Sequence, residues 1–402
     1  MTRQLLAWMP PACAFLFPLH PRATTPLLIA WGVLLLAAWW MHRPTERPSR
    51  PAGWWGGPAL YGLLALGLLW SSSTAEGLFA LEVKAALVVL PLLYRATERL
   101  VQVPMARVSG GLMAGLLTSA ALALGDAVWD TALSGSWAQW RYAELAGALH
   151  PTYLAWYWAF GLFLWLTKSP LRLGLWFALL ASAMIGLLAS KAGWIAGGAI
   201  LSWALVKQRR VVPAVASLLI LVATGWWAGA GRAVELAEGL RTESSAPAAT
   251  DSAAPSPSGS TSGRLQAWSA AWSILQVHPF GVGTGSSQPA LDAIYAARGD
   301  EYAMHHHMNA HNAYLEAAVA WGWLGLAALL GWWITAAAAA WRFRSFETLA
   351  FVAIAAWMAC TESVFELQSG VVWLAFGLYA WGPRPPQASA VSGVFDAASA
   401  RV

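Results

Sequence analysis

The stretch PLLIAWGVLLLAAWWM, at Pro26–Met41, contains no charged residue. It approaches the roughly 20 apolar residues with which a helix crosses about 30 Å of hydrocarbon. Because the run is continuously apolar, whereas the strands of a membrane barrel alternate apolar and polar residues, it predicts a membrane-spanning helix. Similar runs recur along the chain, at Leu60–Trp70, Ala85–Tyr94, Val108–Leu124 and Trp194–Val206.

The composition extends this prediction to the whole chain. Hydrophobic residues make up 58% of the sequence and charged residues only 11%, which is far from the average of soluble globular domains. The 28 tryptophans fit the aromatic belts at the two membrane interfaces. We therefore expect an all-α integral membrane protein with about 12 transmembrane helices.

The net charge of +5 does not indicate a nucleic-acid-binding protein, because most basic residues lie in short loops between apolar runs. Every second loop is basic, as the positive-inside rule requires, and this pattern places both termini in the cytoplasm. The apolar residues continue past Ala12–Ala14, so we expect no cleaved signal peptide. The loops assigned to the inside contain Arg43, Arg47 and Arg50, then Arg95, Arg99 and Arg107, then Lys207, Arg209 and Arg210, then Arg342 and Arg344.

The same pattern divides the chain into four parts: transmembrane helices at 1–230, one large outward loop at 231–310, transmembrane helices at 311–383 and a cytoplasmic tail at 384–402. Within the loop, the Ser/Ala/Pro/Gly tract 243–263 is too poor in apolar groups to order, so it predicts a disordered linker. The spacing of apolar residues in 264–278 predicts an amphipathic helix with Arg264 on its aqueous face. Its apolar face would contain Leu265, Trp268, Trp272 and Leu275, lying on the bilayer or on the helix bundle.

The densest polar group follows that helix, at His305–His307, His311 and Asn312. The spacing matches no zinc motif, and Cys13 and Cys360 both lie in apolar runs, so we expect no metal site. His311 begins a helical run, and histidine is the side chain best suited to general-base work at neutral pH. Helix capping or interface packing is the alternative role for His311.

Other polar residues beside the spans are candidates for binding or support. Asn312 and Glu316 are four residues apart on one helical face, where they could hold an acceptor or orient neighbours. Lys191 and Arg264 are cations on the outward side; Lys191 either reaches the lipid headgroups or binds an anionic group, and the planar fork of Arg264 matches phosphate oxygens. Lys84 is expected to form a structural ion pair with Glu362 or Glu366.

These residues together favour one kind of donor. The glycine-rich turn PFGVGTG lacks the Lys-Ser/Thr of a P-loop, so it predicts a turn and not a nucleotide site. Outside the cytoplasm, the energy for group transfer must come bound to the substrate. A histidine base and cations for a phosphate leaving group fit a sugar linked to a polyprenyl diphosphate.

Several stretches resemble the O-antigen ligase and polymerase superfamily. The signature region is similar at Arg264–Trp272, in HPFGVGTG at His278–Gly285 and in HNAYLEAAVAWGWLGL at His311–Leu326. The resemblance is reinforced by EVKAALVVLPLLY at Glu82–Tyr94, ALHPTYLAWY at Ala148–Tyr157, ASKAGWIAG at Ala189–Gly197 and TESVFELQSGVVWLAFG at Thr361–Gly377.

The resemblance implies a GT-C-like helical bundle with one large periplasmic loop, in the bacterial inner membrane, with its active site facing the periplasm. It implies an undecaprenyl diphosphate-linked glycan as donor, lipid A-core as acceptor, and neither metal nor other cofactor. His311 would activate the acceptor, Arg264 and Lys191 would bind the donor diphosphate, and Asn312, Glu316 and His150 would support the site or bind the acceptor.

Two features leave alternatives open. Lys191 stands where the family usually has arginine, which keeps the charge but loses the bidentate fork. Chain polymerases and protein O-oligosaccharyltransferases share the motifs, so the resemblance identifies the donor class better than the acceptor. A transporter or flippase of lipid-linked glycan is the remaining hypothesis, although the sequence shows no repeat of its two halves.

Overall fold

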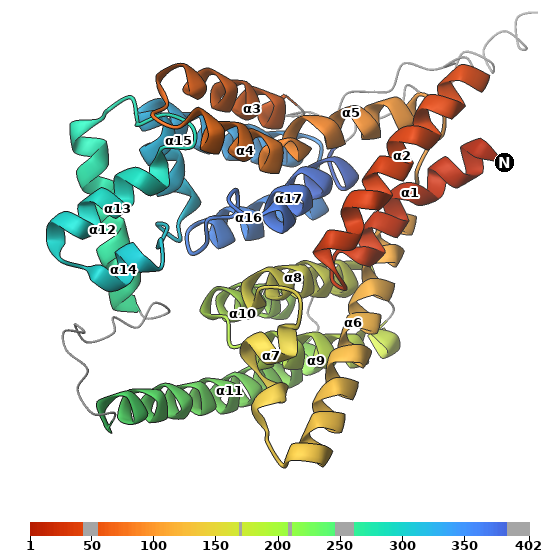
Figure 1. Cartoon of the computed structure of the whole chain (residues 1–402). Helices are drawn as coiled ribbons and strands as arrows, with labels where there is room; N and C mark the ends of the chain where they lie inside the picture. Colours follow the sequence, from red (N-terminus) through yellow and green to blue (C-terminus); the bar gives the residue numbers. More distant parts are fainter. Residues whose placement is uncertain (43–54, 169–170, 208–210, 246–260, 384–402) are drawn as a thin grey trace, which may run out of the picture.

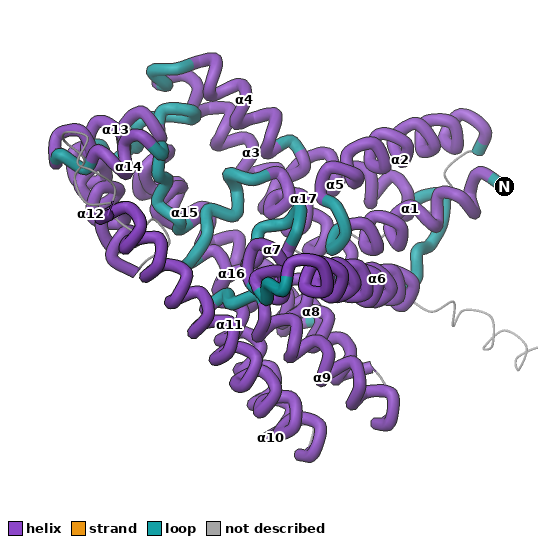
Figure 2. The backbone as a smooth tube through the Cα atoms, turned by 60° about the horizontal axis from the view of Figure 1, so that its bottom comes forward, coloured by secondary structure: helices purple, strands orange, loops and turns teal. Residues whose placement is uncertain are grey.

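The computed structural model describes residues 1–402 except 43–54, 169–170, 208–210, 246–260 and 384–402. Throughout the described residues the chain forms helices joined by loops, without a strand (Figure 2). The predicted tail 384–402 lies outside the described residues, as does most of the predicted linker 243–263.

The helices in chain order are α1 (Thr2–Leu16), α2 (Pro21–Met41), α3 (Gly56–Gly67), η1 (Leu68–Trp70), α4 (Thr74–Lys84), α5 (Ala86–Glu98), α6 (Met105–Ser134), η2 (Ala138–Trp140), α7 (Tyr142–Ala146), α8 (Pro151–Lys168), α9 (Leu171–Leu187), α10 (Lys191–Lys207), α11 (Val211–Ser245), α12 (Thr261–Val277), α13 (Ser287–Arg298), α14 (Glu301–His305), α15 (Ala313–Arg342), α16 (Phe346–Ala359) and α17 (Gln368–Ala380).

Helices distant in sequence pack together around α16 and α17 (Figure 1). Helix α8 contacts α9, α10 and α16, while α17 contacts α5 and α4. Helix α15 contacts α3, α12 and α16, so it joins the short helices α12–α14 to the bundle. The loops at the ends of α8, α15 and α16 therefore meet near the centre of one end of the molecule.

Aromatic rings fill the centre of this bundle. Trp156 and Phe160 of α8, Phe351 of α16, and Trp373 and Phe376 of α17 are fully buried. Edge-to-face pairs join α8, α16 and α17, for example Phe160–Phe351 with ring centroids 5.0 Å apart. Because such rings bury large apolar areas in preferred geometries, they fix how these three helices pack.

The region 261–310 has a small core of its own, formed by α12, α13 and α14 against α15. The side of α12 that packs there contains three alanines, Ala267, Ala270 and Ala271, together with Ile274, whereas Leu265 and Trp272 are exposed. The Arg264 side chain is partly exposed, at 28%, and its guanidinium lies beside the buried Glu362. The spacing of the apolar residues predicted this helix. Its alanines allow the backbone of α12 to approach α15 closely.

A sharp kink divides α15 at Trp321 and Gly322, where the backbone leaves helical geometry. The glycine-rich turn 279–285 packs into this kink: Val282 N–H donates to the carbonyl of Val319 (2.9 Å) and Gly283 N–H to that of Ala320 (2.9 Å). The turn thus satisfies carbonyls that the broken helix leaves free. These amides are committed to the backbone, which agrees with the predicted turn-making role.

Five helices in the described residues are long and apolar enough to cross a membrane. These helices and the all-helical architecture agree with an integral membrane protein; the number of about twelve spans and the outward loop stay predictions. Shorter apolar helices cover Gly56–Trp70, Leu175–Leu187 and Phe346–Ala359. The five candidate spans are Arg22–Met41, Thr74–Glu98, Met105–Ser134, Val211–Ala230 and Ala313–Arg342.

Candidate active site

The carboxylate of Glu362 connects residues from four separate parts of the chain. It lies in the turn between α16 and α17, with a side chain only 9% exposed. Its Oε1 accepts from Thr152 Oγ1 at 3.1 Å and from Arg264 Nη2 at 3.4 Å, and its Oε2 lies 3.8 Å from His311 Nδ1. A buried carboxylate requires such partners, because an unpaired charge would be costly there.

The electrostatic environment of Glu362 keeps it ionised. Burial by itself raises the pKa of this carboxyl, but His311, His150 and Arg264 together lower the pKa below its ordinary value. The lowered pKa means that these interactions together outweigh the cost of desolvation. Glu362 is therefore a fixed negative charge at neutral pH.

His311 lies one residue before the N-cap of α15, and a local network holds it there. Asn312 Oδ1 accepts from the N–H groups of Tyr314 (3.0 Å) and Leu315 (3.1 Å), and Asn312 Nδ2 donates to the carbonyl of Cys360 (3.1 Å). This cap ties the start of α15 to the turn that contains Glu362. His311 itself has a φ of +45°, and its N–H donates to Asn309 Oδ1 (2.9 Å).

The orientation of the His311 ring suits a base. Its Nδ1 faces the Glu362 carboxylate, so a proton on Nδ1 is favoured and Nε2 keeps its lone pair. The 3.8 Å separation is longer than a hydrogen bond, which makes the contact an electrostatic pair. Since the side chain is 32% exposed, the ring remains accessible.

Arg264 is only partly committed to Glu362. One guanidinium nitrogen, Nη2, contacts the carboxylate, while Nε is buried and makes no hydrogen bond to any described residue. The Arg264 side chain is 28% exposed. Its guanidinium can therefore contact an anion beside His311.

Lys191 reaches the same region through its neighbour. Ser190 Oγ donates to Thr152 Oγ1 at 3.3 Å, and Thr152 in turn donates to Glu362. Lys191 follows Ser190 as the first residue of α10, and its side chain is exposed. The start of α10 is therefore joined to Glu362 through Ser190 and Thr152, and Lys191 is the next residue along the chain.

His150 precedes α8, where its Nδ1 accepts from the N–H of Thr152 (3.3 Å). It is also one of the groups that lower the pKa of Glu362. Both contacts place His150 in a supporting position beside the Glu362 cluster.

Glu316 lies five residues after His311 in the sequence, but its carboxylate contacts other residues. Its Oε1 accepts from the N–H of Ala310 (2.7 Å) and from Ser363 Oγ (3.3 Å). Ser363 Oγ also contacts Asn309 Oδ1 at 3.3 Å. Glu316 therefore holds the loop before His311 against the turn that contains Glu362, a supporting role.

The remaining histidines lie outside this cluster. His307 is exposed and its Nδ1 pairs with Asp292 Oδ2 at 2.7 Å, while His306 stacks on Tyr302. Within the described ranges, no three His, Cys, Asp or Glu side chains converge as metal ligands would.

Sequence reasoning missed Glu362 and Thr152 as site residues. Glu362 was expected to be one of two partners for Lys84, but Lys84 Nζ pairs with Glu366 Oε1 at 3.1 Å, which confirms the predicted structural pair and leaves Glu362 for the site. The available signal was the isolated carboxylate in TESVFELQSG, next to a span. Nothing in the sequence showed that α8 and α12 would bring Thr152 and Arg264 to it.

Comparison with known proteins agrees with the resemblance. Residues 176–330 match the family model described as O-antigen ligase. The matched segment includes Lys191, Arg264 and His311, whereas His150 and Glu362 lie outside it. No curated protein matches the chain. The matched segment, which is less than half of the chain, is thus similar to the O-antigen ligase family, and the candidate spans agree with a multi-pass membrane protein.

Proposed function

We propose that the protein transfers a glycan from undecaprenyl diphosphate to a hydroxyl acceptor, most specifically lipid A-core, on the periplasmic side of the inner membrane. The observation that supports this proposal is the shared carboxylate: Glu362 contacts both a histidine with an accessible ring and an arginine with uncommitted donors. A base and an anion-binding cation are thereby held next to each other.

The proposed reaction exchanges one bond for another at the anomeric carbon of the donor sugar. The acceptor hydroxyl oxygen forms a new bond to this carbon, and the bond between the carbon and the diphosphate oxygen breaks. His311 Nε2 takes the hydroxyl proton, and the negative Glu362 stabilises the resulting imidazolium. The diphosphate leaves with the bonding electron pair, and Arg264 and Lys191 stabilise its charge.

The other polar residues have supporting roles in this proposal. Asn312 and Glu316 hold the His311 loop, and His150 contacts Thr152, which donates to Glu362. No residue role requires a metal or another cofactor. The same chemistry serves a chain polymerase or a protein O-oligosaccharyltransferase, which differ only in the acceptor hydroxyl.

The test compares cells that lack the gene, complemented with the native protein, with His311→Ala or with His306→Ala at matched membrane levels. Loss of a general base lowers a rate by about 10²–10⁴-fold, so His311→Ala should leave lipid A-core without glycan while polyprenyl-linked chains accumulate. His306 is exposed and stacks only on Tyr302, so His306→Ala should behave as the native protein.

Three outcomes distinguish the alternatives. If cells lacking the gene still attach glycan to lipid A-core, but this glycan is only one unit long, the protein is a polymerase. Lipid-linked glycan that stays on the cytoplasmic side in those cells indicates a flippase. Full activity of His311→Ala contradicts the assignment of His311 as the base.

A further inference from the structure

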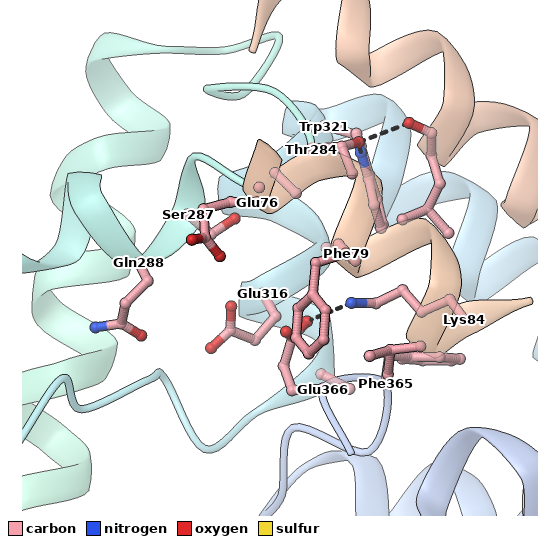
Figure 3. A pocket seen from close by; sticks show the side chains of 17 residues that line it. Glu76, Phe79, Lys84, Thr284, Ser287, Gln288, Glu316, Trp321, Phe365 and Glu366 are labelled. Atoms are coloured by element: carbon pink, nitrogen blue, oxygen red, sulfur yellow. Dashed lines mark hydrogen bonds and ion pairs between the residues drawn. The ribbon is translucent and has the colours of Figure 1, made fainter. Parts of the chain in front are cut away.

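A cavity of about 190 Å³ lies beside the first turns of α15, and Glu362 is not among its lining residues (Figure 3). It is enclosed by α4, the start of α13, the first turns of α15 and the residues just before α17. None of the residues assigned above to base or diphosphate binding lines it. Its walls include the polar side chains Glu76, Lys84, Gln288, Glu316 and Glu366.

The charge of the cavity is opposite to that of the Glu362 cluster. Three carboxylates line it, those of Glu76, Glu316 and Glu366, against the single cation Lys84, which is already paired with Glu366 at 3.1 Å. The excess negative charge disfavours a phosphate or diphosphate group. A negatively charged occupant is therefore disfavoured in this cavity.

Polar atoms with remaining hydrogen-bonding capacity face this space. Glu316 is buried, and its Oε1 takes both of the hydrogen bonds that the structure assigns to its carboxylate, so Oε2 is the oxygen left for an occupant. The Gln288 amide nitrogen donates to Asp292 Oδ1 (2.7 Å), which leaves the amide oxygen as an acceptor. Such oxygens accept hydrogen bonds from hydroxyl groups.

Aromatic rings supply the apolar walls. Phe79, Trp321 and Phe365 all line the cavity. The indole N–H of Trp321 donates to Thr284 Oγ1 at 2.8 Å, so this ring is fixed in orientation. A ligand that fits has hydroxyl groups at its edge and C–H groups on its faces, which describes a pyranose ring.

We propose that this cavity binds one uncharged pyranose residue of the glycan substrate. Its volume corresponds to about six water molecules at roughly 30 Å³ each, which is enough room for a single sugar ring. The inference rests on the proposed function, because the sugar assigned to this cavity is a residue of the proposed glycan substrate that lies outside the reaction centre.

The cavity is coupled to the reaction centre by shared segments. Glu316 lines the cavity and also binds the N–H of Ala310, next to His311. Glu366 lines it from the same turn that carries Glu362. A glycan held here is thus anchored on the two segments that position the base and its carboxylate.

The experiment measures binding directly, without requiring transfer. The purified full-length protein in detergent is titrated with D-glucose, D-galactose, D-mannose, N-acetyl-D-glucosamine and L-rhamnose, followed by saturation-transfer NMR. Two matched pairs on α4 test the site: Phe79→Ala against Leu78→Ala, and Glu76→Gln against Glu82→Gln. Phe79 and Leu78 are similarly exposed, at 61% and 56%, but only Phe79 lines the cavity, so folding should survive in both.

At least one sugar should bind saturably, and Phe79→Ala should weaken that binding about 10-fold while Leu78→Ala leaves it unchanged. Glu76→Gln should weaken it and Glu82→Gln should not. Glucose 6-phosphate should bind more weakly than glucose because of the carboxylates. Absence of saturable binding by every sugar, or equal binding by Phe79→Ala and Leu78→Ala, overturns the proposal.

The same assay separates this proposal from the proposed function. His311→Ala should bind the sugar as the native protein does, although it should not transfer glycan. Sugar binding that depends on Phe79, in a protein that transfers no glycan in cells, would refute the proposed function and leave the cavity assignment intact.

Discussion

Glu362 shows how one buried carboxylate can organise residues of different roles. Its two oxygens face Thr152 and Arg264 on one side and His311 on the other. Because these partners lie far apart in sequence, loss of the carboxylate would leave Arg264 and His311 without their common counter-charge. Removing one member of a buried charged cluster is costly, since its partners remain desolvated.

The lowered pKa of Glu362 leads to a prediction about acid stability. A carboxyl with a pKa depressed by folding contributes stability above its unfolded pKa, and this contribution is lost as the pH falls through the folded pKa. The ordinary value is 4.5, so the native protein should have its full contribution from Glu362 above about pH 5 and lose it at lower pH. The thermal unfolding midpoint in detergent, measured from pH 3 to pH 7, checks this expectation.

Glu362→Gln provides the comparison, because it keeps the shape and removes the charge. The native protein should have the higher unfolding midpoint at pH 6, and the difference should shrink as the pH falls below about 4. A difference that stays constant over the whole range would show that ionisation of Glu362 does not contribute to stability.

At the scale of elements, the kink in α15 is the feature that positions the end of α12 relative to α3. The turn 279–285 inserts between them: Thr284 N–H donates to the carbonyl of Gly67 (3.1 Å), and Thr284 Oγ1 donates to that of Leu64 (2.7 Å). The turn thereby joins α3, α12 and α15. Its glycines are required where backbone segments approach each other closely.

Gly283 is the position where substitution should be most informative. Its φ is +94°, and a Cβ would lie 2.7 Å from Ser71 Cα. Gly283→Ala should therefore destabilise the protein by about 1–3 kcal/mol, through backbone strain and steric conflict together. Thermal unfolding of the detergent-solubilised protein measures the effect.

Gly299→Ala is the matched control, because Gly299 also has a positive φ, +69°, but has no described atom within 4 Å of its Cβ position. It isolates the cost of backbone strain. If Gly283→Ala and Gly299→Ala destabilise equally, close packing of the turn contributes nothing.

At the scale of the whole molecule, the proposed reaction requires that the Glu362 cluster and the carboxylate-lined cavity open on the same side of the membrane. Both are formed at the ends of helices predicted to face outward, while the turn between α15 and α16 carries Arg342 and Arg344. The basic turn at the opposite end of α15 follows the positive-inside rule.

Cysteine labelling tests this orientation. In a variant with Cys13 and Cys360 replaced by serine, Glu301→Cys should react with a membrane-impermeant maleimide in intact spheroplasts, because Glu301 is exposed next to the outward histidines. Arg344→Cys should react only after the membrane is disrupted. Labelling of Arg344→Cys in intact spheroplasts would reverse the predicted topology.

The sequence by itself determined the helical membrane architecture. It also identified residues that can take part in catalysis or binding. Continuous apolar runs permit only helices across a lipid bilayer, so this prediction needed no long-range information. His311, Arg264 and Lys191 were found because charged and ionisable groups beside spans are expensive and therefore noticeable. The helix around 264–278 and the role of the glycine turn also followed from local spacing and backbone freedom.

The tertiary structure alone decided which of these residues meet. The packing of α8, α12, α15 and α16 brought Thr152, Arg264 and His311 to Glu362, and assigned Glu366 to Lys84. The inward orientation of Arg264 depended on small alanines packing against α15, which a pattern of large apolar residues does not reveal. Pairing between distant charges is fixed by three-dimensional packing, and periodicity along one helix contains no information about it.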